Sequence, residues 1–200
     1  MTFKIILLVV LGAVIGLALP MQDLTVLDGL ISTALCLLLF GVGLSLGRDR
    51  HLFSSMRSLG RVVLVVPVGV AAGSIIGASL AGFVLGLPLN ESAAIGAGFG
   101  WYSLSAVLIS RVYAVEVGAL AFLSNVLREL VALAIIPWIA VRFGYLAAVA
   151  PGGATAMDVT LPIIAKSTDS KTTLVAFVTG VLLSLAVPVL VPLLIGLGGG

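Results

Sequence analysis

Long apolar stretches, separated by short polar loops, run along almost the whole chain. We place seven of them, at residues 4–20, 28–46, 60–86, 92–110, 116–136, 138–166 and 172–196. A helix crosses the hydrocarbon core of a bilayer with about 20 apolar residues, whereas membrane β-strands are shorter and alternate in polarity. The pattern predicts an all-α integral membrane protein with about seven transmembrane segments, built as a single transmembrane domain over residues 1–200.

Composition agrees with this class and excludes others. The chain of 200 residues is 61% hydrophobic and 9% charged, whereas soluble domains contain about 25% charged residues. No basic face exists that would bind nucleic acid. The single cysteine, Cys36, and the single histidine leave no internal disulfide and no cysteine- or histidine-rich metal site. We expect no cofactor.

The basic residues predict an orientation in the cell membrane. We interpret the first apolar segment as a transmembrane helix rather than a cleaved signal peptide. With the N-terminus inside and the C-terminus outside, eight of the ten basic residues fall on the cytoplasmic side, as the positive-inside rule requires: Lys4, Arg48, Arg50, Arg57, Arg61, Arg111, Lys166 and Lys171. Arg142 would then lie outside, and Arg128 within the membrane.

The first polar interruption lies in the fourth apolar segment. Residues 96–100 carry glycine at alternate positions, and Tyr102, Ser103 and Ser105 follow. Each glycine destabilises a helix interior by about 1 kcal/mol relative to alanine. We expect local unwinding around a polar cavity that these hydroxyls line, since free backbone groups are tolerated at membrane depth only there. The alternative is close helix packing on the glycines.

The second interruption places Asn125, Arg128 and Glu129 near the middle of the fifth segment. Charges at this depth are costly and usually mark a pathway or pair with each other. Adjacent helical residues point about 100° apart, so Arg128 and Glu129 cannot easily satisfy each other. We therefore favour a functional role for both. The alternative is a self-neutralised pair that locks neighbouring helices.

The third interruption spans residues 151–162. Pro151 and two glycines should stop a helix that arrives from Pro137, and Thr155 could cap a new helix with Asp158 three residues on. The expected result is two half-helices joined near mid-depth. A half-helix start at Gly153 to Thr155 would offer N–H groups to a carboxylate. The alternative is that Asp158 only caps a helix at the interface.

Two broken segments, each followed by an intact span, are typical of secondary transporters. Helical pores and intramembrane enzymes also contain broken helices.

A further pattern is the recurrence of Gly69, Gly73 and Gly77 on one face of the third segment. Small residues at this spacing let helices approach closely. They predict a packing face, within the chain or between protomers.

These same stretches resemble the lysine exporter family. The agreement covers residues 98–105, Arg128-Glu129-Leu130, Pro137, residues 153–162 and residues 184–188, with weaker agreement over residues 40–44. The resemblance implies export of L-lysine and its analogues from the cytoplasm in exchange for protons, and a core like that of cation/proton antiporters. Bacterial members are often longer, with extra N-terminal helices. The resemblance therefore implies a short form, and a homodimer could replace the missing helices.

The resulting hypothesis is a proton-coupled lysine exporter and not an enzyme. Glu129 would accept the substrate ammonium or a proton, Asp158 would assist, and Arg128 would balance Glu129 or contact the substrate carboxylate. The chain near Gly153 and Thr155 and the hydroxyls would bind the amino-acid backbone groups. Rival hypotheses are a sodium or other cation/proton antiporter, a passive pore, and an intramembrane hydrolase, for which the chain lacks a pair of aspartates at depth.

Overall fold

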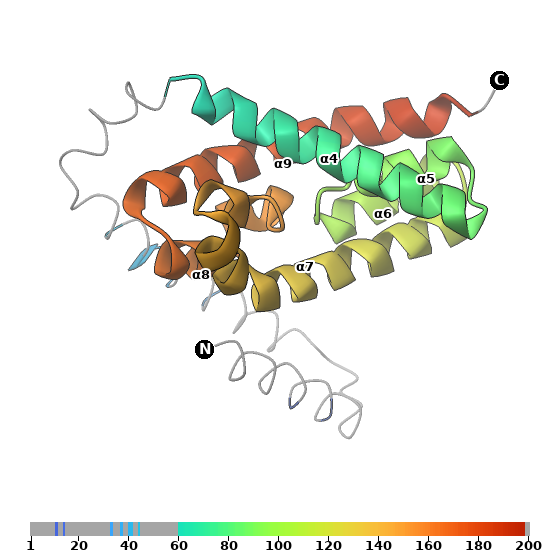
Figure 1. The fold of residues 1–200 in the computed structure, drawn as a ribbon. Coiled ribbons are helices and arrows are strands. Elements are labelled where there is room, and N and C mark those ends of the chain that lie inside the picture. Colours follow the sequence, from blue (N-terminus) through green and yellow to red (C-terminus); the bar gives the residue numbers. More distant parts are fainter. Residues whose placement is uncertain are drawn as a thin grey trace.

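The computed structural model describes residues 60–198 and seven isolated positions between residues 11 and 44. The first two predicted segments, 4–20 and 28–46, otherwise lie outside the described residues. The described part contains helices and no strands. Three helices are long and apolar enough to cross a membrane: α4 (Val62–Leu85), α7 (Val115–Phe143) and α9 (Ser170–Gly196). They correspond to the predicted segments 60–86, 116–136 and 172–196 (Figure 1).

Large apolar side chains point outward along these helices. Examples are Phe83, Val84 and Val141, each more than four-fifths exposed. Soluble monomers rarely expose such continuous apolar surface, whereas lipid covers it without penalty. The outer surface therefore agrees with a membrane location.

Helices α4 and α9 run in one direction and α7 runs in the other. One apolar cluster joins Val66 near the start of α4, Ile136 near the end of α7 and Ala176 near the start of α9. The second cluster joins Ala121 near the start of α7 to Ile195 at the end of α9. The three long helices therefore alternate in direction, as successive crossings of a membrane would.

The chain between α4 and α7 folds as a hairpin, which we call hairpin A (residues 89–112). It consists of α5 (Leu89–Gly96) and α6 (Tyr102–Val112), joined by turns. The Tyr113 hydroxyl, just after α6, donates a hydrogen bond of 2.9 Å to Oε1 of Glu91, near the start of α5. Hairpin A thus begins and finishes at the same end of the bundle.

This arrangement corrects the prediction that residues 92–110 cross the membrane. The physical reason is length: α5 rises only about 12 Å and α6 about 17 Å, each well short of a ~30 Å core. The glycine-rich turn at residues 97–101 reverses the chain, where we had expected it only to unwind.

A second hairpin, hairpin B (residues 144–167), follows α7. It contains two short 3-10 helices, η1 (Leu146–Val149) and η2 (Gly153–Met157), and then α8 (Leu161–Ser167). Leu161 and Ile164 of α8 join the apolar cluster that holds the end of α7 and the start of α9. Hairpin B therefore begins and finishes at the end opposite to hairpin A, and residues 138–166 do not form the predicted span.

The break expected at Pro137 is also corrected. Helix α7 continues through Pro137 to Phe143. Ala132, Ile136 and Ala140 are all buried at a spacing of four residues, so one apolar face continues across the proline. Packing of that face outweighs the hydrogen bond that proline removes, as is common in membrane helices. The helix instead ends at Gly144, whose φ is +94°.

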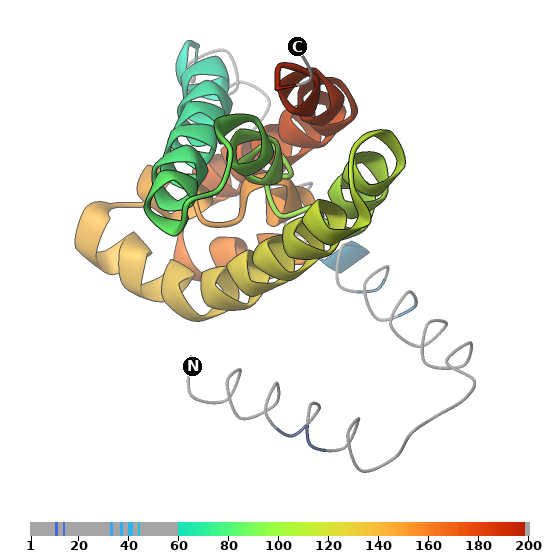
Figure 2. The ribbon, with the colours of Figure 1, turned by 90° about the vertical axis from the view of Figure 1, so that its right-hand side faces the viewer.

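The tips of the two hairpins meet at the centre of the bundle. The backbone N–H of Ala154, in hairpin B, donates a 2.8 Å hydrogen bond to the carbonyl of Phe99, in hairpin A. Figure 2 shows α4, α7 and α9 around this junction. Each hairpin is followed by a long helix of opposite direction, so the two hairpin-plus-helix units have inverted orientations.

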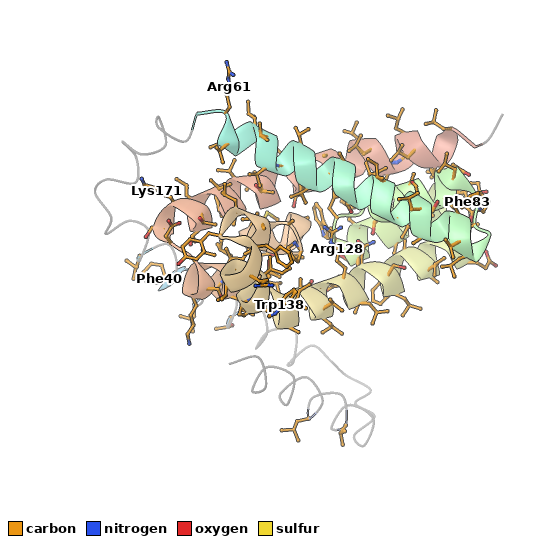
Figure 3. The ribbon with its side chains drawn as sticks, in the orientation of Figure 1. Phe40, Arg61, Phe83, Arg128, Trp138 and Lys171 are labelled. Atoms are coloured by element: carbon orange, nitrogen blue, oxygen red, sulfur yellow. The ribbon has the colours of Figure 1, made fainter. Side chains whose placement is uncertain are left out.

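In this topology, two basic residues lie at the opposite end of the bundle from the one that the sequence predicted. Arg61, Arg142, Lys166 and Lys171 lie at the end of the bundle where α4 and α9 begin, and Figure 3 shows Arg61 and Lys171 there, with Phe83 at the other end. Arg111, in the last turn of α6, lies at the opposite end. Relative to the predicted topology, Arg142 and Arg111 have exchanged sides.

Single-cysteine labelling in membrane vesicles tests this topology. In a Cys36→Ser background, Leu89→Cys and Val115→Cys should react with an impermeant thiol reagent from one side, and Arg142→Cys from the other. All three positions are exposed. Seven crossings would instead place residues 89 and 142 together and residue 115 opposite them, and that labelling pattern would contradict the hairpins.

Candidate functional site

The hairpin tips enclose a cavity of about 240 Å³, which we call the central cavity. Each hairpin supplies part of its wall, α7 supplies a carboxylate and α9 a hydroxyl. Its lining residues are Gly100, Trp101, Tyr102 and Ser103 from hairpin A, Glu129 from α7, Ala154, Thr155, Met157, Asp158 and Val159 from hairpin B, and Ser184 from α9. Of the residues predicted for binding, the structure therefore brings Glu129, Asp158, Tyr102, Ser103 and Thr155 together.

Two carboxylates give the central cavity its charge. Glu129 and Asp158 are both partly buried. Asp158 accepts a 2.6 Å hydrogen bond from the N–H of Val159, and Glu129 has no hydrogen-bond or ion-pair partner within residues 60–198. Among residues 60–198, no lysine, arginine or histidine belongs to the lining. Uncompensated carboxylates at membrane depth are unfavourable, so this cavity favours a bound cation or a proton.

Arg128 faces away from the central cavity. Its Nε and Nη2 atoms donate 3.3 Å hydrogen bonds to the carbonyls of Pro151 and Ala150, and Nη1 donates to Oγ of Ser74. Figure 3 shows its side chain in the space between α4, α7 and hairpin B. Arg128 and Glu129 do not satisfy each other, as the helix geometry predicted. The expectation that Arg128 balances Glu129 does not match this placement.

Asn125 anchors the tip of hairpin A to α7. Its Oδ1 accepts a 2.7 Å hydrogen bond from the Gly100 N–H, and its Nδ2 donates to the carbonyls of Ile95 at 3.2 Å and Ala121 at 2.9 Å. The side chain is 3% exposed. A Cβ on Gly98 would lie 2.6 Å from Nδ2 of Asn125, so glycine permits this close approach. Asn125 supports the cavity wall and does not line the central cavity.

We expect Asn125→Ala to lower stability. The change leaves the Gly100 N–H buried without a partner, at a cost of about 1–3 kcal/mol, and it removes one of the two hydrogen bonds that the Ile95 carbonyl accepts. Thermal unfolding in detergent should show a clear decrease, whereas Ser124→Ala, the neighbouring and less buried position, should change little. Equal unfolding temperatures for the two variants would contradict the anchoring role.

Two other predicted site residues lie elsewhere than expected. Ser105 is completely buried and donates a 2.9 Å hydrogen bond to the carbonyl of Trp101, so its hydroxyl is directed at the backbone and not at the cavity. Gly153 is buried at the tip of hairpin B with φ +58°. Its role in the structure is the turn itself.

The predicted helix start at Thr155 is also corrected. Thr155 lies within η2, and its Oγ1 donates a 2.8 Å hydrogen bond back to the Gly152 carbonyl. Helix α8 begins only at Leu161, after Thr160. Thr155 and Asp158 do not form the predicted helix cap, because the glycines favour a tight 3-10 turn. This turn directs the Asp158 side chain into the central cavity instead of toward Thr155.

Gly69, Gly73 and Gly77 form a wall of a second cavity, of about 520 Å³, with Ser74 and Arg128. A Cβ at any of the three glycines would meet nothing within 4 Å in the described part of the chain. The predicted packing within the chain is therefore not observed among these residues.

Sequence reasoning missed Ser74, Trp101, Met157 and Ser184. Ser184 donates a 3.6 Å hydrogen bond to Sδ of Met157 across the central cavity wall. The one available signal for Ser74 was a hydroxyl among the glycines of an apolar segment.

The fold and the site together define a class of protein. Long apolar helices surround two opposed hairpins and a cavity with two carboxylates, and this combination defines a helical membrane protein with a polar interior. The chain belongs to the family described as lysine exporter LysO, whose model matches residues 6–195. The resemblance predicted from the motifs is thereby confirmed.

Individual relatives agree with this assignment. The lysine exporter LysO of Escherichia coli is 36% identical over 181 residues, which are 89% of this chain and 60% of that protein. A second relative, from Haemophilus influenzae, is 33% identical over 153 residues, which are 76% of this chain and 77% of that protein. The chain thus spans about 60% of the length of the Escherichia coli relative. No solved structure matches the chain.

Proposed function

We propose that this chain exports L-lysine from the cytoplasm in exchange for protons, and that the central cavity binds the substrate. One observation carries this proposal: Glu129 and Asp158 face a cavity at the meeting point of the two hairpins, and the described part of the chain adds no basic residue to its lining. Family membership supports lysine as the substrate. The family consists of transporters, so an enzymatic function is not favoured.

The proposed mechanism is competition for one carboxylate. The substrate ammonium and a proton both neutralise Glu129, and only one of them can do so at a time. Export coupled to proton entry follows if the cavity opens alternately to the two sides of the membrane. Asp158 assists by adding negative charge, and the hydroxyls of Tyr102, Ser103 and Thr155 bind the amino and carboxylate groups of the substrate.

The arrangement of helices supports a core like that of cation/proton antiporters. In such transporters, discontinuous segments from two inverted units meet at mid-depth and form the site. Hairpins A and B meet in this manner through Ala154 and Phe99. We propose an alternating movement of the hairpin units, and a homodimer as the assembly.

We further propose the cell membrane as the location. The end of the bundle with Arg61, Arg142, Lys166 and Lys171 then faces the cytoplasm, by the positive-inside rule. Because α4, α7 and α9 alternate in direction, the end of α9 faces outward. The N-terminus lies inside if the two segments before α4 each cross once.

Counterflow of radiolabelled lysine in proteoliposomes tests the proposal. We expect exchange of lysine that accelerates when a pH gradient is imposed, because protons compete for the same carboxylate. Lysine flux that does not change when the pH gradient is imposed would contradict proton coupling. No lysine movement, with sodium flux present, would select a sodium antiporter, and gradient-insensitive ion flux would select a pore.

A further inference from the structure

Ser74 contacts both hairpins although it lies on neither. It is in the middle of α4, and its Oγ donates a 2.8 Å hydrogen bond to the carbonyl of Gly96, the last residue of α5 in hairpin A. The same Oγ accepts a hydrogen bond from Nη1 of Arg128. A serine hydroxyl has one donor and two acceptor positions, so it satisfies both partners at once.

Arg128 extends this contact to hairpin B. Its other two nitrogens donate to the carbonyls of Ala150 and Pro151, which lie between η1 and η2. A continuous series of hydrogen bonds therefore runs from the Gly96 carbonyl through Ser74 and Arg128 to hairpin B. The charged guanidinium strengthens each of its bonds relative to neutral pairs.

The contact between α4 and hairpin A is tight at this point. A Cβ on Gly96 would lie 2.6 Å from Cβ of Ala78 and 2.8 Å from the Ser74 carbonyl. The Gly96 carbonyl is thus held at a defined place on α4. Because the central cavity is bounded by residues 100–103 on one side and residues 154–159 on the other, the distance between the hairpin tips determines its length.

We propose that Ser74 is a positioning residue that holds the two hairpin tips at a fixed separation and so determines which length of cationic amino acid the central cavity accepts. Its part in substrate selection rests on the proposed function; its part in holding the tips does not. Ser74 does not itself line the central cavity. The tips keep a direct contact of their own, from Ala154 to Phe99, so the loss of the Ser74 hydroxyl loosens them without unfolding the bundle.

Amide hydrogen exchange of the purified protein tests the positioning role without any substrate. In Ser74→Ala, residues 97–101 and residues 150–154 should both exchange about tenfold faster, the factor expected for loss of one typical hydrogen bond. Ser74→Thr keeps the hydroxyl and should restore slow exchange. Ser79→Ala, a matched change on the same helix, should leave both segments unchanged. Faster exchange in only one segment, or in neither, would overturn the proposal.

Transport of two substrates of different length tests the consequence for selection. The ratio of lysine to ornithine transport, measured as kcat/KM in proteoliposomes, should fall about fivefold in Ser74→Ala, since one methylene is worth roughly 1 kcal/mol in a fitted cavity. Loss of folded protein would lower both rates and leave the ratio unchanged. An unchanged ratio, with faster exchange at both tips, would overturn the selection role.

The two proposals fail in different ways. If the unaltered chain transports neither amino acid, the proposed function is contradicted, and hydrogen exchange still decides whether Ser74 holds the tips. If the chain transports lysine and Ser74→Ala behaves as the unaltered chain in both measurements, the proposed function stands and the positioning role is overturned.

Discussion

Glu129→Gln is expected to abolish lysine counterflow in proteoliposomes. Glutamine keeps the size of glutamate, replaces one carboxylate oxygen by an NH2 group, and removes the charge that a substrate ammonium would meet. Removing one partner of a desolvated charge pair costs about 2–5 kcal/mol, which corresponds to a loss of roughly 30-fold or more. Because Glu129 has no hydrogen-bond or ion-pair partner in the described part of the chain, its replacement breaks no polar contact that stabilises the fold.

The matched control for this prediction lies on the same helix. Glu116 is in the first turn of α7 and is exposed, so Glu116→Gln should retain full transport. The thermal unfolding temperature of Glu129→Gln should equal or exceed that of the unaltered chain, since a partly buried charge has been removed. Unchanged lysine counterflow in Glu129→Gln would refute the assignment of Glu129 to the substrate and the proton.

Gly153→Ala should have the largest effect on the fold. At φ +58° an alanine is strained by about 1–2 kcal/mol. Its Cβ would also meet the Phe99 carbonyl, and would lie 2.9 Å from Nη2 of Arg128. Overpacking of this kind adds about 1–3 kcal/mol. The methyl group would enter between the two hairpin tips, so we expect both a large loss of stability and a loss of transport.

The thermal unfolding temperature in detergent and lysine counterflow measure this change. Gly196→Ala is the control, because Gly196 ends α9, has no positive φ and has open space where a Cβ would lie. It should behave as the unaltered chain. If Gly153→Ala matched Gly196→Ala in stability, the close contact of the hairpin tips at Gly153 would be disproved.

Much of the site was predictable because lipid makes polar residues conspicuous. Glu129 and Asp158 interrupt apolar sequence, and the glycines before Tyr102 mark a break in a helix. The predictions that failed concern the direction in which individual side chains point. Arg128 was expected to balance Glu129 in the substrate site, yet it faces a different cavity. Ser105 follows the same glycines as Tyr102 and Ser103, but its hydroxyl bonds to backbone.

The sequence by itself determined the class of the protein, its three long helices among residues 60–198 and the places where polar groups enter the apolar interior. These follow from composition and local spacing, which are properties of neighbouring residues. Only the tertiary structure decided that two predicted spans turn back as hairpins. An apolar segment has the same hydropathy whether it crosses the membrane or turns back as a hairpin. The choice depends on contacts between distant residues, such as Ala154 with Phe99 and Asn125 with Gly100.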